Sequence, residues 1–345
     1  MPRWEDVDRK VRTGTPMPSA WGGSGTLLGK LWGRKVPVVD PSFGDPRLAR
    51  MRAAALEGGP GRWAAVRAPL AAAHGPEDQS FLVTGIHKIS GVERWISDEV
   101  EQHPDDTLAL LVSGARHVAW AWQARGGGWG SSVPEPQLTL FQERLRIAER
   151  QLFEVAEREP HWAAPWYFLQ MCGRGLQVGP EEAAKRFEAT LRRAPGHVGA
   201  HLQHLQQVSG KWGGSHREMF DFARRTARSA PEGSPLGQLV AMAHLENWLD
   251  DGGGEVSPVL RDPGVVRELH ATAALSVHHP AFVRERDWAI GVNIFAMAFA
   301  LAGENAAARV MFRSLGGRVT ETPWIYINGQ SPVVPFLAWR TRVGA

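Results

Sequence analysis

The chain has 345 residues, 43% of them hydrophobic, and a formal net charge of +3 at pH 7. This hydrophobic content excludes disorder as the state of the whole chain, because it is enough to bury a large core. The small net charge and the lack of a basic stripe with interleaved aromatic residues argue against nucleic-acid binding. The single cysteine, Cys172, excludes an internal disulfide framework.

The beginning of the chain predicts neither a leader nor a membrane anchor. The first residues, MPRWEDVDRKVR, carry acids and no apolar run, unlike a secretory signal. No segment approaches the roughly 20 uninterrupted apolar residues that a membrane span requires. We therefore expect a cytoplasmic protein with no membrane partner.

Residues 1–44 are rich in glycine and proline, which disfavours a regular helix. We predict an extended arm here, which either stays mobile or lies across the first helices. From Asp45 onward apolar residues recur at helical spacing, and Asp45 followed by Pro46 is a typical helix start. The predicted helices of this first part are 46–57, 62–74, 77–90, 91–103, 107–125 and 137–159.

Pro160, Pro195 and Pro231 lie 35 and 36 residues apart, and each follows a helical run. This period is typical of tetratricopeptide-like (TPR-like) repeats, in which each unit is a pair of helices that needs neighbours to bury its apolar face. Gly179 and Pro180 divide the first unit. In the second, Ser215 followed by Glu218 predicts a capping box at the start of its second helix.

Beyond Pro231 the pattern predicts further helices at about 234–248, 264–276, 280–301 and 304–315. Residues 318–345 are broken by prolines and rich in tryptophan, isoleucine and valine. We predict that they form an extended strap that packs on the last repeat. The expected architecture is an all-α helical-repeat domain over 45–317, with the arm 1–44 before it and the strap after it.

A resemblance to a known family rests on six segments of the chain. They are DPRLARMRAAALEGG, LALLVSGARHVAWAWQARG, FQERLRIAE, KWGGSHREMFDFAR, APEGSPLGQLVAMAH and LGGRVTETPW. Together they resemble a family of TPR-like proteins widespread in actinobacteria, and KWGGSH is a fairly specific motif. The resemblance covers about residues 45–325 and implies the helical-repeat fold. It implies no biochemical activity.

In repeats of this type the first helix of each pair lines a concave groove. The repeat positions select apolar, amide and arginine side chains, which suit an extended peptide or a helix of a partner protein. The selected residues are Tyr167, Met171, Arg174, Leu202, Gln206, Gln238 and Met242. We therefore expect a binding protein, an adaptor or scaffold without a cofactor, unless inserted segments fill the groove. A purely structural subunit of a larger assembly is a further possibility.

His197, His201 and His204 share one helix face, and such spacing can bring imidazoles to one transition metal ion. A ligand from a neighbouring helix, such as His244, Glu246 or His216, would complete the site. The alternative function is therefore a metal-dependent enzyme of a specialised biosynthetic pathway. Against this, the repeat places His201 and His204 at core positions, where packed histidines need no metal. The sequence contains no linear catalytic motif, so catalytic residues stay unknown.

Overall fold

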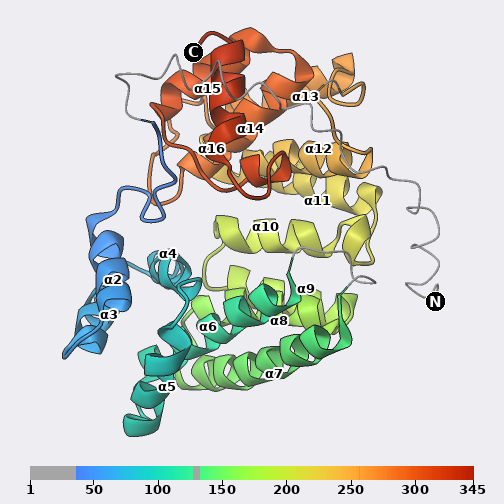
Figure 1. The fold of residues 1–345 in the computed structure, drawn as a ribbon. Helices are drawn as coiled ribbons and strands as arrows, with labels where there is room; N and C mark the ends of the chain where they lie inside the picture. The colour runs from blue at the N-terminus through green and yellow to red at the C-terminus, as the bar shows by residue number, and fades with distance from the viewer. Residues whose placement is uncertain (1–35, 127–132, 256) are drawn as a thin grey trace.

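The structure is a computed structural model that describes residues 36–126, 133–255 and 257–345. Within these ranges the chain forms fifteen α-helices and no β-strand (Figure 1), which confirms the all-α class. Residues 36–40 have no regular secondary structure and 41–44 form a turn. The rest of the predicted arm, residues 1–35, lies outside the described part of the chain.

The first part of the fold begins where the sequence predicted a helix start. Asp45 caps the first helix, and its carboxylate accepts hydrogen bonds from the backbone N–H groups of Arg47 and Leu48 at 2.7 and 3.2 Å. The helices of this part are α2 (Pro46–Glu57), α3 (Arg62–Ala71), α4 (Pro76–His87), α5 (Val92–Gln102), α6 (Thr107–Arg125) and α7 (Glu135–Arg158). The bounds of α6 are those predicted, while α3 ends three residues earlier than predicted.

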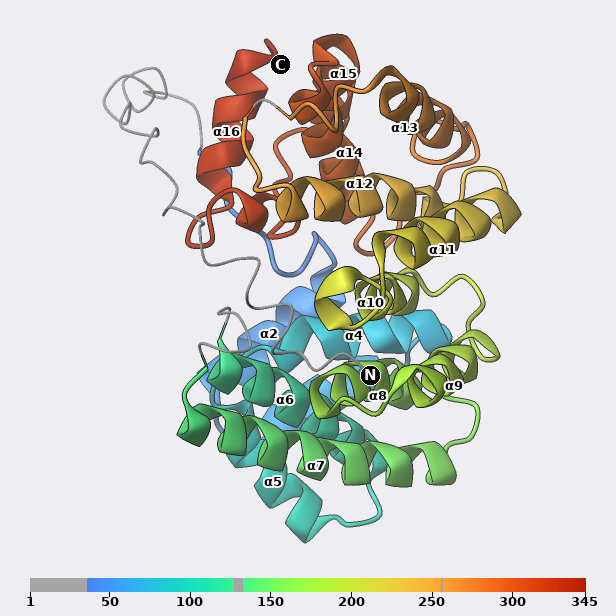
Figure 2. The same cartoon turned by 90° about the vertical axis from the view of Figure 1, so that its right-hand side faces the viewer.

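The two longest helices, α6 and α7, pack closely side by side (Figures 1 and 2). A Cβ atom at Gly114 of α6 would lie 2.9 Å from Cγ of Leu152 on α7. Real Cβ atoms do not approach that closely, so the absence of a side chain at Gly114 sets the separation of the two helices.

The middle of the chain follows the predicted helix breaks. The predicted first unit corresponds to the helices α8 (Ala164–Leu176) and α9 (Pro180–Leu191), and the predicted second unit to α10 (Val198–Gln207) and α11 (His216–Ser229). A short 3-10 helix, η4 (Gly210–Trp212), precedes α11. The Ser215 hydroxyl caps α11 by accepting a hydrogen bond from the Glu218 N–H at 3.2 Å, as the capping box predicts.

The last part contains α12 (Gln238–Asp250), α13 (Pro263–Leu275), α14 (Ala289–Ala302), α15 (Asn305–Leu315) and α16 (Val333–Arg342), with 3-10 helices η5 (Pro235–Gly237) and η6 (Trp324–Tyr326). Helix α14 reads AIGVNIFAMAFALA and is apolar on nearly every side. Such a helix must be buried, and α14 lies at the centre of this part, surrounded by its neighbours (Figure 2).

Two predictions for this part were wrong in detail. Helix α14 begins at Ala289, because residues 280–288 form turns and irregular backbone instead of the first helical turns. The tail was predicted to be extended, but it contains η6 and the ten-residue helix α16. Its prolines do not prevent this, because Pro332 precedes α16 and Pro335 lies in its first turn, where no backbone N–H donor is needed.

The buried apolar side chains form two separate cores. The first involves α2 to α9, and the second involves α11 to α16. Helix α10 contributes Ala200 to the first core and Leu205 to the second, and Figure 2 shows it between α8 and α12. Residues 36–44 also touch both cores, since Val39 packs against the second and Phe43 against the first.

Candidate functional site

Polar side chains gather where the two cores meet, and we call this region the polar seam. They come from α8, from α10 and the η4 turn that follows it, from α12, from the turn before α14 and from η6. The residues of the polar seam are Tyr167, Arg174, Gln206, Lys211, Trp212, Met242, Glu246, Asp287 and Tyr326, together with Trp122 of α6. Four of them, Tyr167, Arg174, Gln206 and Met242, are groove residues selected from the sequence.

One end of the polar seam is organised around Glu246, which is 2% exposed. Its Oε1 accepts hydrogen bonds from Gln206 Nε2 at 2.5 Å and from the Tyr326 hydroxyl at 2.7 Å. Its Oε2 pairs with Lys211 Nζ at 2.6 Å. The Tyr326 hydroxyl also lies 3.9 Å from the Met242 sulfur. A buried carboxylate with three donors is fully partnered, so it fixes α10, α12 and η6 relative to one another.

Arg174 lies in the middle of the polar seam, beside two tryptophans. Its guanidinium carbon is 5.3 Å from the ring centroid of Trp122 and 5.5 Å from that of Trp212. The two indoles meet edge to face at 5.6 Å, and the Arg125 guanidinium lies against the same pair. Cation–π contact therefore holds Arg174 in a defined orientation.

The hydrogen bonds of Arg174 are incomplete. Its Nη1 donates to the backbone carbonyl of Gln203 at 3.3 Å, but its buried Nε has no acceptor. In the described part of the chain no carboxylate lies within ion-pair distance of this guanidinium, and Glu246 acts on it only from further away. Burial lowers the pKa of Arg174 to about 10, so the side chain is still a cation at neutral pH.

The indole N–H of Trp122 is also buried and without an acceptor. Two neighbouring side chains thus present N–H donors that none of the described residues satisfies. A buried donor without a partner destabilises the fold by about 1–3 kcal/mol. Such groups call for an acceptor that the described residues do not supply, and the same pairing of a buried arginine Nε with a buried indole N–H recurs at Arg62 and Trp95.

The other end of the polar seam holds Tyr167 and Asp287. Burial raises the pKa of Tyr167 to about 12, and the negative charge of Asp287 adds to the shift. The side chains of Thr84 and Gln203 interact with the Tyr167 hydroxyl. Burial also raises the pKa of Asp287, although the positive charge of the neighbouring Arg286 opposes that shift. Arg286 itself pairs with Glu77 at 2.7 Å and so links the turn before α14 to α4.

The remaining groove residues have contacts of a different kind. Met171 is buried in the first core, and Leu202 packs against the second. Gln238 is buried at the start of α12, where its Nε2 donates to the Pro235 carbonyl at 3.0 Å and its Oε1 lies beside Gly291. These three side chains contribute to packing.

The three histidines of α10 are engaged in packing and capping. His197 caps the helix, because its Nδ1 accepts a hydrogen bond from the Ala200 N–H at 3.1 Å. His201 Nδ1 lies 2.9 Å from the His197 carbonyl and donates to it. His204 stacks on Phe187 with ring centroids 4.2 Å apart and an interplanar angle of 7°. Burial lowers the pKa of all three rings, to about 4 for His197 and His204.

His244, the predicted fourth ligand, has a different partner. Its Nε2 lies 2.9 Å from Oε2 of Glu268, which also pairs with Arg224 at 2.6 Å. Among the residues that the structure describes, no group of three or more His, Cys, Asp or Glu side chains is arranged to hold a metal ion. The spacing along α10 therefore brings the imidazoles together with aromatic rings, chiefly those of Phe187 and Phe222.

Several members of the polar seam were not selected from the sequence. Lys211 and Trp212 belong to the KWGGSH segment, which was noted for its resemblance and not as part of a site. Tyr326 and Asp287 come from segments outside the repeat pattern. Only contacts between residues 80 and more positions apart bring Tyr326 to Glu246 and Met242, so no local pattern could have indicated it.

Comparisons with protein-family models, with curated proteins and with solved structures found no match to this chain. Within the described ranges, none of the helices combines the length and the apolar character needed to cross a membrane.

Proposed function

We propose that this protein binds a peptide segment of a partner protein at the polar seam, and that an acidic group of the peptide contacts Arg174. The observation that carries the proposal is the pair of neighbouring N–H donors on Arg174 and Trp122 that lack acceptors. A carboxylate supplies acceptor oxygens and a negative charge at once, which is what a guanidinium without a carboxylate partner recognises best.

The surroundings of Arg174 suit a peptide. The Trp122 and Trp212 rings are partly exposed and offer aromatic surface, and Gln206, which is also partly exposed, adds a polar group. Binding sites often lie between two packed units, and here they would lie between the two cores. In this proposal the pairs α8 with α9 and α10 with α11 act as units of a TPR-like array, and the protein is a cytoplasmic adaptor.

The test begins with selection of binding peptides from a random library on the immobilised full-length protein. The affinity of each selected peptide is then measured by fluorescence anisotropy, alongside its counterpart with Asp and Glu replaced by Asn and Gln. We expect the acidic peptide to bind at least about tenfold more tightly, because a charge-assisted hydrogen bond contributes about 1.5–3 kcal/mol.

An Arg174→Met variant should lose this preference, since the acidic and neutral peptides would then bind alike. Arg150→Gln is the matched control, because Arg150 is exposed on α7 and has the same charge. It should bind like the wild type. Selection of no peptide at all, or selected peptides that ignore the Arg174→Met change, would refute the proposal.

The alternative of a metal-dependent enzyme depends on the histidine spacing of α10. It is tested by elemental analysis of protein purified without a chelator or a histidine tag. A stoichiometric transition metal that disappears in a folded His201→Ala/His204→Ala variant would support the enzyme and redirect the search to oxidative or hydrolytic chemistry. A metal-free protein would leave peptide binding as the function to pursue.

A further inference from the structure

The two halves of the molecule, α2 to α9 and α11 to α16, meet at α10 and at the segment that precedes α2. Among the described helices, α10 packs extensively on both sides, against α8 and α9 and against α11 and α12. Phe222 of α11 adds to this joint, since its ring centroid lies 5.6 Å from that of Phe187 on α9. The other joint is residues 36–44, drawn in dark blue in Figures 1 and 2, which run from α2 to the helices around the second core. Two units joined in this way can open about one joint only when the other is released.

The segment 36–44 has one apolar anchor in each half. Val39 is partly buried and packs against the second core. Phe43 packs against the first core, where its ring centroid lies 6.0 Å from that of Phe81 on α4. The chain from Val39 to Phe43 can span at most about 14 Å even when it is fully extended. The two halves therefore cannot separate at this place while both anchors are engaged.

The residues between the two anchors form a tightly hydrogen-bonded turn. The Asp40 carboxylate accepts hydrogen bonds from the Ser42 N–H at 2.9 Å, the Ser42 hydroxyl at 2.6 Å and the Gly44 N–H at 2.8 Å. The Asp45 N–H donates to the Ser42 carbonyl at 2.9 Å, and Asp45 also caps α2. These bonds hold Phe43 at a φ of 55°, a conformation that bulky side chains rarely adopt. The segment is thus a preformed hook that continues from α2, and not a loose tether.

Two ion pairs also connect α4 and the residue that follows it to the second half. Glu77 of α4 pairs with Arg286 at 2.7 Å, and both side chains are about one-third exposed. Lys88 pairs with Glu321 at 3.2 Å, and both are more than half exposed. Ion pairs with this much exposure to water stabilise little. The apolar anchors of the segment 36–44 are therefore the stronger connection between α4 and the second half.

We propose that residues 36–44 act as a clasp that keeps the two halves closed around the polar seam, and that release of either anchor lets the halves open about α10. Opening moves Tyr167 of α8 away from Asp287 in the turn before α14, whose charges interact in the closed state. This end of the polar seam then becomes accessible to solvent. The clasp is inferred from contacts between the halves and does not depend on what the polar seam binds.

The experiment is hydrogen–deuterium exchange of the full-length protein, measured by mass spectrometry for the wild type and for two variants. Val39→Asp places an unpaired carboxylate at the second anchor, which expels it from the core, and Phe43→Ala removes the first anchor. We expect both variants to exchange at least about tenfold faster in the same two segments of the second half, 284–290 and 321–328. The reason is that either change releases the same clasp.

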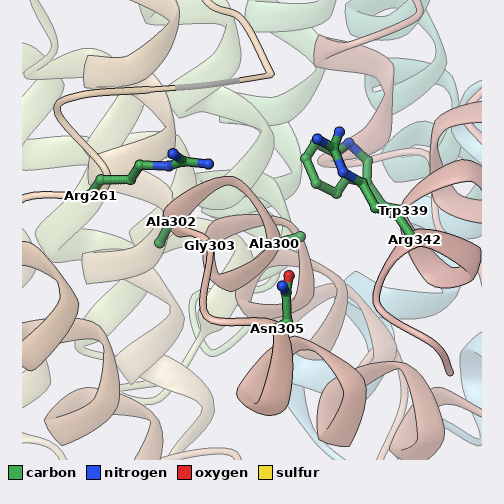
Figure 3. A pocket seen from close by; sticks show the side chains of 7 residues that line it. All are labelled: Arg261, Ala300, Ala302, Gly303, Asn305, Trp339 and Arg342. Atoms are coloured by element: carbon green, nitrogen blue, oxygen red, sulfur yellow. The ribbon is translucent and has the colours of Figure 1, made fainter.

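Two regions serve as references within each protein. Helix α5 lies at the opposite end of the first half (Figure 1). The turn that joins α14 to α15, beside the cavity of about 400 Å³ shown in Figure 3, lies at the far end of α14 from residues 284–290. Both regions should exchange as in the wild type, because opening about α10 leaves the packing inside each half unchanged.

Val38→Asp is the matched control for Val39→Asp, because Val38 is the neighbouring valine and is 73% exposed. Met51→Ala controls for Phe43→Ala, since Met51 is buried in the first core on α2 and belongs to neither anchor. Circular dichroism checks that each variant is folded, and the milder Val39→Ala should give the pattern of Val39→Asp to a smaller extent. The proposal is wrong if Val38→Asp or Met51→Ala accelerates exchange in 284–290 and 321–328 as strongly, or if the effect of Phe43→Ala stays within α2 and α4.

Discussion

The interior arginines of the first core and the arginine of the polar seam differ in how they are paired. Arg116 is 1% exposed and donates to the Glu93 carboxylate at 2.8 Å, to the His87 carbonyl and to Gln123. Arg186 is 4% exposed and pairs with Glu149 at 2.7 Å and Glu182 at 3.1 Å. Both guanidinium groups have carboxylates to balance their charge.

Arg174 carries the same guanidinium group as Arg116 and Arg186 but has fewer partners for its charge and its N–H donors. It has two aromatic rings and one backbone carbonyl around it, with no carboxylate in contact among the described residues. Folding stability alone favours the arrangement of Arg116 and Arg186, because an unpaired cation away from water is costly. The first core thus uses these two arginines for cohesion, whereas Arg174 lacks such carboxylate partners, which is the feature on which our proposal of a bound acidic peptide rests.

The largest expected effect comes from breaking a paired arginine. Arg186→Met removes the cation but keeps much of the apolar stem, and leaves the Glu149 and Glu182 carboxylates and the Leu169 carbonyl without their donor. We expect the free energy of unfolding to fall by about 3 kcal/mol, as for other buried ion pairs that lose one partner. Urea unfolding followed by circular dichroism measures this change. A variant as stable as the wild type would show that the pairing does not hold the first core.

The buried histidines should make the stability of the protein depend on pH. Burial lowers the pKa of His204 from its ordinary value of 6.5, which the unfolded chain retains, to about 4 in the folded protein. Between these two values the unfolded chain binds the proton more readily. Stability is therefore complete above pH 6.5 and decreases as the pH falls toward 4. Between about pH 6.5 and 4.5 this one imidazole should account for a loss of about 2 kcal/mol.

His204→Phe preserves a ring for stacking on Phe187 and removes the titrating group. Its unfolding free energy should fall less steeply over the same pH range. His161→Gln serves as the control, since it removes one exposed imidazole. Equal slopes for wild type and His204→Phe would contradict the packing role of this ring.

Much of the helical fold could be predicted because its signals are local. Asp45, Gly179 and Ser215 mark helix starts through capping or turn chemistry, and the apolar period between them specifies buried faces. The start of α14 was missed because the apolar and polar residues of 280–288 also fit a helical period. The helix in the tail was missed because prolines in its first turn look the same as prolines that break a strand.

The site could be predicted only in part, for a related reason. Repeat positions selected Tyr167, Arg174, Gln206 and Met242, and these four residues belong to the polar seam. The same rule also selected Met171 and Gln238, which are packed. The seam partners Asp287 and Tyr326 reach it through tertiary contacts across the chain, and a sequence period carries no information about those contacts.

Replacing Arg174 of the polar seam should change the free energy of unfolding in the opposite direction to replacing Arg186 of the first core. Arg174→Met replaces a guanidinium with no carboxylate partner by an apolar side chain, which avoids the desolvation of the charge. We expect the free energy of unfolding to stay the same or to rise by about 1 kcal/mol, while the preference for acidic peptides is lost. A loss of stability similar to that of Arg186→Met, measured by the same urea titration, would show that Arg174 is a structural residue.

The smallest effect is expected where the two halves touch at the surface. Lys88, which follows α4, pairs with Glu321 of the tail at 3.2 Å, and both side chains are more than half exposed. Glu321→Gln should lower the free energy of unfolding by no more than about 0.5 kcal/mol, and raising the salt concentration should remove even that difference. If α10 joins the halves by contributing to both cores, unfolding stays a single transition in this variant. Two separate transitions, one for each core, would mean instead that exposed ion pairs hold the halves together, and the polar seam would then be a loose contact unable to orient Arg174 for a ligand.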